Sequence, residues 1–328
     1  MRIRRSTTVL AVTALATLAA VAPSSAATEL GGAWAPFTRC PVDNPAMLAA
    51  DGQTDVAICI ASSSASGSIK LGDSQVPTGR TDLQAGVVTH PGGTSTVVSP
   101  PGGALVADPA ELPGGLLGLM CPSGIPLVSD ICKQLTDNTL NRVTATVESV
   151  NTPTDFQLLN GVQQGKPIIT LPVRIKLDNP FLGDSCYIGS ASDPIVLRPQ
   201  NVTAPAVSQG RFDPDGTANP TGVLGRINAD DADQGDATYT VPGANGCGLL
   251  GALDFAVNLK SGIPAASGKN NVVLKSASTH VAVFADPKSV APDEGALLSQ
   301  YWHAAVKYPA SGLFHNPRTK QLTRFVRN

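Results

Sequence analysis

The chain has 328 residues, of which 23 are Lys or Arg and 25 are Asp or Glu, so its net charge is −2. Such a small charge gives no bulk attraction for nucleic acid, and we expect no nucleic-acid partner. The 32 glycines and 27 prolines favour short strands joined by many turns over long helices.

The first 27 residues have the three parts of a secretory signal peptide. Three arginines fall within residues 1–5, an apolar run covers residues 9–22, and small residues precede a cleavage point after Ala26 or Ala27. Losing those arginines would leave 20 basic side chains against 25 acidic ones. No later apolar run is long enough to span a membrane. We therefore expect a mature protein without a transmembrane segment that is secreted, extracellular or loosely associated with the cell envelope.

Six cysteines follow the predicted signal peptide, in a compartment where disulfides persist. The sequence alone leaves many connectivities open. Sequential pairing closes modest loops, and it is our prediction: Cys40–Cys59, Cys121–Cys132 and Cys186–Cys247. Because there is no CxxC motif and no Cys/His cluster with ligand spacing, structural bridges are favoured over a metal or redox site.

Alternating apolar and polar residues predict strands over residues 56–60, 143–147, 169–177 and 253–259. Residues 271–285 are also strand-like. Antiparallel sheets with one wet face are typical of this alternation. Pro172 cannot donate a backbone hydrogen bond, so the strand over 169–177 is expected at a sheet edge or with a bulge.

Helix signals are few. A short helix is predicted around residues 127–135, and a better one over 296–307, with acids before its start and Lys307 in its last turn. Residues 90–115 and 198–222 are predicted as Gly/Pro-rich loops, the second followed by an acidic run from Asp230 to Asp236. No internal repeat is present.

These elements predict a mainly β fold: an antiparallel β-sandwich-like domain with disulfides over residues 28–285. A short C-terminal helix and a basic tail would follow over 286–328, looking like an appendage to the β core. The signal peptide would occupy residues 1–27.

Four segments resemble one family: residues 115–124 (GLLGLMCPSG), 143–149 (VTATVES), 169–199 and 241–271. Together they are similar to uncharacterised secreted proteins of actinobacteria, over about residues 40–274. The resemblance implies a secreted, disulfide-containing protein. It implies no activity and no catalytic residues.

Nucleophilic hydrolysis would need a serine or cysteine beside a histidine. The chain has no G-x-S-x-G motif and four histidines: His90, His280, His303 and His315. Only His280 falls inside the predicted domain near a regular element. A triad built on it is one interpretation, and a solvated strand histidine is the simpler one.

A calcium site could form from clustered carboxylates at Asp230, Asp231, Asp233 and Asp236. Their order does not match an EF-hand loop, because glycine comes one position too early. A solvated acidic loop is therefore the preferred interpretation, and we expect no metal and no cofactor.

The tail combines the apolar anchors Tyr301, Trp302, Val306 and Phe314 with five basic residues after Glu294. Such a segment suits adhesion to an anionic envelope polymer; the alternative is a helix packed on the sandwich with a frayed basic end.

Two functions remain. The preferred one is a non-enzymatic extracellular or envelope-associated protein with a structural or binding role. The other is a secreted hydrolase that uses carboxylates or His280.

Overall fold

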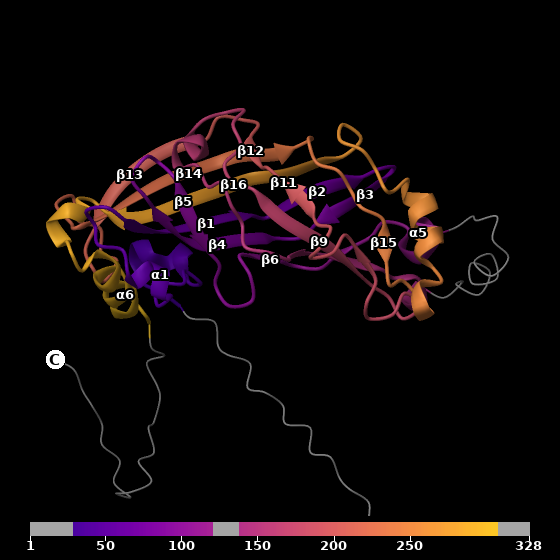
Figure 1. The fold of residues 1–328 in the computed structure, drawn as a ribbon. Helices are drawn as coiled ribbons and strands as arrows, with labels where there is room; N and C mark the ends of the chain where they lie inside the picture. Colours follow the sequence, from indigo (N-terminus) through magenta and orange to yellow (C-terminus); the bar gives the residue numbers. More distant parts are fainter. Residues whose placement is uncertain (1–28, 121–137, 308–328) are drawn as a thin grey trace, which may run out of the picture.

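The computed structural model describes residues 29–120 and 138–307, and it is mainly β with antiparallel sheets (Figure 1). This confirms the predicted fold class. Four predictions lie outside the described residues: the signal peptide over 1–27, the Cys121–Cys132 bridge, the helix around 127–135 and the basic tail beyond residue 307.

One long sheet of ten strands forms the body of the described part of the molecule. A second sheet of six short strands packs on one end of it. The long sheet contains β1 (Val56–Ser64), β2 (Ser66–Leu71), β3 (Ser74–Thr78), β4 (Thr81–Thr89), β5 (Ser95–Val98), β6 (Leu105–Ala107), β12 (Gln200–Asn201), β13 (Ala206–Phe212), β14 (Leu224–Asp236) and β16 (Asn271–Phe284). The short sheet contains β7 (Ala110–Glu111), β8 (Thr144–Ser149), β9 (Leu171–Asp178), β10 (Tyr187–Ile188), β11 (Ile195–Leu197) and β15 (Ala244–Asn245).

A very long hairpin makes the centre of the long sheet. β1 pairs with β4, and β2 pairs with β3. The two pairings keep one register, from Val56 opposite Thr89 to Leu71 opposite Ser74. The tip turns at Gly72, whose φ is +59° and whose Cβ, if present, would lie 2.4 Å from the Ser261 carbonyl oxygen. Glycine is therefore required at this turn for both its conformation and its close approach to the backbone.

In the first strand of this hairpin, the residues that face the inner side of the sheet are even-numbered in β1 and odd-numbered in β2. Ile58 and Ile60 belong to one buried cluster, whereas Ile69 and Leu71 belong to the next, and Leu83 packs against both. Strict alternation from Ile60 would have buried Lys70. Left-handed backbone at Ser276 in β16 and Asp231 in β14 falls in the same zone of the sheet. The inversion keeps one continuous apolar layer on the inner side.

The layer between the two sheets is closed at one end by α2 (Gly115–Met120) and α5 (Asp254–Ser261). Short helical segments lie nearby: α4 (Asn138–Asn141) contacts α2, and η3 (Leu249–Gly251) precedes α5. Toward the other end, the segment around η2 (Leu158–Val162) covers the same face with Phe156, Ile168 and Ile169.

The opposite face of the long sheet carries a second core at the other end of the molecule (Figure 1). It is covered by η1 (Gly32–Phe37), α1 (Pro45–Leu48), η4 (Pro287–Val290) and α6 (Glu294–Ala304). α6 confirms the predicted C-terminal helix. It is built into the core rather than appended to it, because Leu298 is fully buried and the Trp302 indole donates to the Phe37 carbonyl at 2.8 Å.

Several predicted elements are confirmed, and β9 most clearly, with buried and half-buried residues in strict alternation. Its position at an edge was predicted wrongly, because β8 flanks it on one side and β10 and β11 on the other. The Pro172 carbonyl accepts from the Val150 N–H, just beyond the end of β8. The N–H that proline lacks would point to the same side of β9, where the pairing with β8 has ended, so proline is tolerated there.

The strand predicted over 253–259 is wrong: these residues form most of α5. Leu253, Ala256 and Val257 are buried, at the spacing of a helix, while Phe255 and Leu259 point outward. The apolar residues fit both the two-residue period of a strand and the spacing of a helix. Asp254 in the first turn and Gly262 after the last, with φ +64°, decide for a helix.

Both predicted loops contain strands. Residues 90–115 include β5, β6 and β7, and residues 198–222 include β12 and the seven-residue β13. The acidic run that follows lies within β14 rather than in a loop. Edge strands tolerate polar, glycine-containing sequences because a long neighbour supplies the hydrogen bonds, and this explains why composition alone misled the prediction.

Candidate functional site

Two of the three predicted disulfides lie in the described residues, and both are confirmed. Cys40 pairs with Cys59 with their Cα atoms 5.7 Å apart, and Cys186 pairs with Cys247 at 4.1 Å. Cys59, Cys186 and Cys247 are completely buried, and Cys40 nearly so. Because thiol chemistry requires access to sulfur, these bridges are structural. Disulfides of this kind indicate an oxidising environment.

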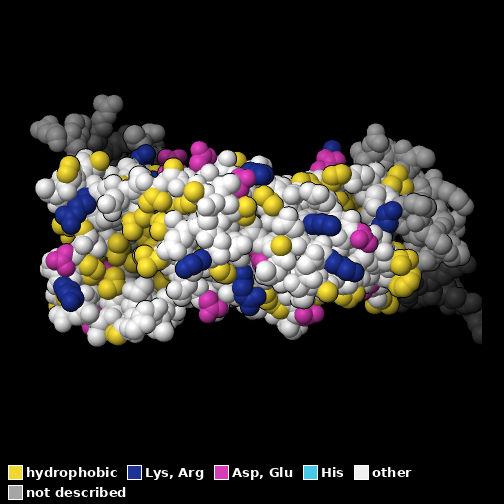
Figure 2. Space-filling model, turned by 90° about the horizontal axis from the view of Figure 1, so that it is seen from above, with side chains coloured by type: hydrophobic (Ala, Val, Ile, Leu, Met, Phe, Trp, Pro, Cys, Tyr) yellow, Lys and Arg dark blue, Asp and Glu magenta, His cyan; other side chains and the backbone are white. Residues whose placement is uncertain are grey.

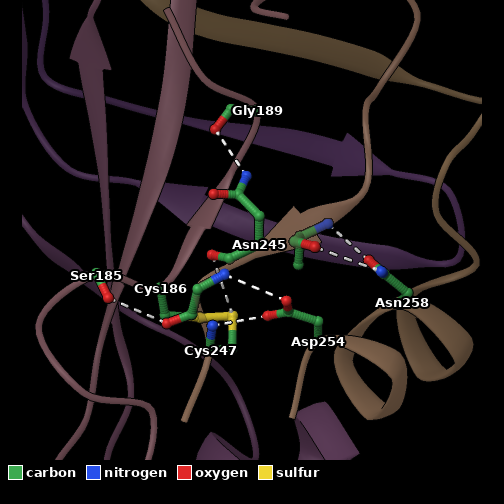
Figure 3. The surroundings of a disulfide bond; sticks show 9 residues. Ser185, Cys186, Gly189, Asn245, Cys247, Asp254 and Asn258 are labelled. Carbon is green, nitrogen blue, oxygen red and sulfur yellow. Dashed lines mark hydrogen bonds between the residues drawn. A yellow bond between two sulfur atoms is a disulfide. The ribbon is translucent and has the colours of Figure 1, made fainter. Parts of the chain in front are cut away.

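The Cys186–Cys247 bridge joins the short sheet to the start of α5 (Figure 3). One Asp254 carboxylate oxygen accepts from the Cys247 N–H at 2.7 Å, and the other accepts from the Gly246 N–H at 3.3 Å. Asn258, one turn later, accepts from the Ala244 N–H at 2.6 Å. The first turns of α5 are therefore held to β15 and to the bridge by side chains that cap backbone donors.

The four carboxylates considered for calcium do not converge. Asp233 pairs with Lys275, and Asp236 accepts from the backbone of Arg198 and Thr238. Asp231 is exposed, and Asp230 is half-buried near the charge of Arg226. No group of three or more His, Cys, Asp or Glu side chains is placed to hold a metal ion within residues 29–120 and 138–307.

His280 lies on β16 beside Asn228 and Arg226 of β14. Its Nδ1 is 3.0 Å from Asn228 Oδ1, and the Arg226 guanidinium is 3.4 Å away. Burial lowers the pKa of His280 and the positive charge of Arg226 lowers it further, while the negative charge of Asp230, which makes no hydrogen bond to the imidazole, opposes this shift. Neither contact is a carboxylate, so the arrangement does not hold the imidazole as a Ser–His–Asp triad would.

A groove of about 660 Å³ lies on the face that carries α6. Three segments far apart in sequence form it: residues 38–44, residues 99–101 and Trp302. Pro41, Val42, Pro100 and Pro101 give it apolar walls, while Arg39, Asp43, Asn44 and Ser99 supply polar groups. Its volume lies in the range of ligand-binding sites. The Cys40–Cys59 bridge fixes its floor to β1.

Asp43 joins this groove to α6. Its carboxylate accepts from the Ser299 hydroxyl at 2.6 Å and from His303 Nε2 at 3.0 Å. The Ser299 hydrogen bond and His303 hold the pKa of Asp43 below its usual range. A hydrolytic triad places histidine between serine and acid. Here the carboxylate is between them and is a weak base, so the cluster fixes the groove wall and activates no nucleophile.

Arg39 holds the opposite wall. Its guanidinium donates to the carbonyls of Gly103, Asp82 and Ala104 at 2.8 to 3.1 Å, which ties the loop after β5 to the hairpin. Arg39 Nε also lies 3.5 Å from an Asp82 carboxylate oxygen, whereas Ser99 Oγ is buried without a hydrogen-bond partner within the described residues.

The groove was not predicted from the sequence. Its parts are up to about 260 residues apart in the chain, and Asp43, Ser299 and Arg39 belong to no motif. His303 and Trp302 were noted only as members of the C-terminal helix. Of the other histidines, His90 contacts Asp55 and Thr96 in an exposed hairpin turn, and His315 lies outside the described residues.

Comparison with protein-family models, with curated proteins and with solved structures finds no match. None of the described helices is long and apolar enough to cross a membrane.

Proposed function

We propose that the protein is a secreted, non-enzymatic binding protein of the cell envelope, and that the groove beside α6 holds a segment of an envelope polymer. The groove carries this proposal, because it combines a ligand-sized volume with apolar walls and polar groups already fixed in place. The buried disulfides, the predicted signal peptide and the resemblance to secreted proteins support an extracellular location.

The polar groups of the groove favour binding over chemistry. The hydrogen bonds of Asp43 and most of those of Arg39 serve to position the walls. Among the described residues that line the groove, Asp43 is the one carboxylate, whereas glycoside hydrolysis needs two acids facing each other. The Asn44 amide and the proline rings suit the hydroxyls and apolar faces of a sugar-containing chain.

Sedimentation with purified cell-wall sacculi tests the proposal. Pro101→Trp fills the groove with a bulky ring at an exposed turn and is expected to lower binding at least tenfold. Pro91→Trp makes the same change in an exposed turn outside the groove and should bind as the wild type does. Absence of wild-type binding, or equal binding by both variants, would refute the proposal that the groove binds the polymer. Release of soluble fragments from the sacculi would favour the hydrolase instead.

A further inference from the structure

Four large apolar side chains are exposed together where η3 leads into α5. Leu249 and Leu250 are 86% and 98% exposed, and Phe255 and Leu259 are each 63% exposed. We call these four residues the apolar tip. Single exposed leucines are ordinary on protein surfaces, but a group of large ones within eleven residues marks an interaction site.

The local backbone displays the tip rather than hiding it. Leu250 adopts a left-handed conformation, with φ 55° and ψ 28°, which is costly for a residue with a β-carbon and places its side chain in solvent. Phe255 and Leu259 are four residues apart, so they share the outer side of α5, while Ala256 and Val257 face the core.

The base of the tip is held firmly. Cys247, immediately before the turn, is bridged to Cys186, and Asp254 accepts from the backbone of Cys247 and Gly246. Apolar side chains on a fixed base lose little conformational freedom when they are buried by a partner. The tip is therefore preorganised for contact.

The size and place of the tip distinguish between partners. It has four large exposed side chains, far fewer than the roughly 20–30 residues that each partner contributes to a stable protein complex. It also lies at the end of a long molecule, where α5 closes the sheets (Figure 1). Hydrophobic side chains are visible at that end in the view from above (Figure 2).

A small protruding group of leucine and phenylalanine matches a lipid bilayer better than a flat protein surface. Such side chains enter the boundary between headgroups and acyl chains, and a neighbouring lysine can extend to the headgroups. Lys260, which follows Leu259, is exposed. We propose that the apolar tip docks the protein on the surface of a lipid membrane, through insertion of Leu249, Leu250, Phe255 and Leu259.

Flotation of the full chain with neutral phosphatidylcholine vesicles tests this docking, because such vesicles offer no net charge to the basic C-terminal sequence. Leu250→Asn is expected to weaken binding about tenfold, the loss for removing one large apolar side chain from a lipid contact. Asparagine tolerates the left-handed backbone, so this variant should fold as the wild type does. Leu159→Asn is the matched control, since Leu159 is 70% exposed in η2, away from the tip, and it should bind normally.

Three results would overturn the inference. The wild type fails to float with neutral vesicles, or Leu159→Asn weakens flotation as much as Leu250→Asn does. Alternatively, the wild type forms a concentration-dependent dimer in sedimentation velocity that Leu250→Asn abolishes, which would assign the tip to a second copy of the chain. Sacculus binding through the groove is measured separately, so failure at the tip leaves the proposed function unaffected.

Discussion

Glu294, in the first turn of α6, is a carboxyl group with no exposed surface. One of its oxygens accepts from the Ala57 N–H at 3.0 Å, and the other has no partner within the described residues. Burial raises the pKa of Glu294 to about 7, and the nearby charge of Asp51 adds to this. The folded protein therefore holds this proton more tightly than the unfolded chain does.

The sign of the pH dependence follows from that difference. Stability from Glu294 is fully present below its ordinary pKa of 4.5 and is lost as pH rises through about 7. At roughly 1.4 kcal/mol per pKa unit, the loss amounts to up to about 3 kcal/mol. Glu294→Gln mimics the protonated acid, so it should be more stable than the wild type at pH 8 and similar at pH 4.

Urea unfolding at several pH values measures this effect. Glu148→Gln is the control, because Glu148 is a partly exposed acid paired with Arg174 and should not change the slope between pH 5 and 8. If Glu294→Gln keeps the wild-type pH dependence, the buried carboxyl is not its source.

Each described bridge closes a different length of chain, which predicts their relative contributions. Cys40 and Cys59 are 19 residues apart, and Cys186 and Cys247 are 61 apart. Restriction of the unfolded chain grows with loop length, giving about 3 kcal/mol for the shorter loop and about 4 kcal/mol for the longer one. Replacing the Cys186–Cys247 pair by alanines should therefore destabilise more than replacing the Cys40–Cys59 pair, as measured by denaturant unfolding. The reverse order would show that local packing outweighs chain entropy.

Elements whose side chains alternate between a buried and a wet face were predictable from sequence. β9 is of this kind, with buried and half-buried residues in strict alternation. β1 was found from the same apolar pattern, although both of its faces are buried from Ala57 to Ala61. α5 was not, because apolar residues at 253, 255, 257 and 259 fit a strand, and only its contacts expose Phe255 and Leu259. β13 was missed for the opposite reason: six of its seven residues are exposed, so it has no alternation to detect.

The disulfide pairings could be predicted from the spacing of the cysteines along the chain. The groove could not be predicted in this way. It depends on Asp43 meeting Ser299 across a sequence separation of 256 residues and on Arg39 binding carbonyls beyond β5. Contacts of this range arise from the packing of α6 and the N-terminal segment on the long sheet, for which no local pattern is diagnostic. For the same reason His280, the histidine singled out by sequence, lies away from the groove, whereas His303 lies at its edge.

Across the whole molecule, the two proposed contact regions belong to different ends. α6 and the groove lie toward one end of the long sheet, and η3 and α5, which carry the apolar tip, lie at the other (Figure 1). The continuous hairpin from Val56 to Thr89 connects the two regions by a single rigid sheet. A protein built in this way can hold a polymer at one end while the other end contacts a membrane.

The most direct test of the account is hydrogen exchange of the full chain with and without purified sacculi, read residue by residue. We expect slower exchange confined to residues 38–44 and 99–101 and the last turn of α6, with no cleavage of the polymer. Protection centred on His280 and β14 instead, or soluble fragments released during the incubation, would contradict a binding role for the groove.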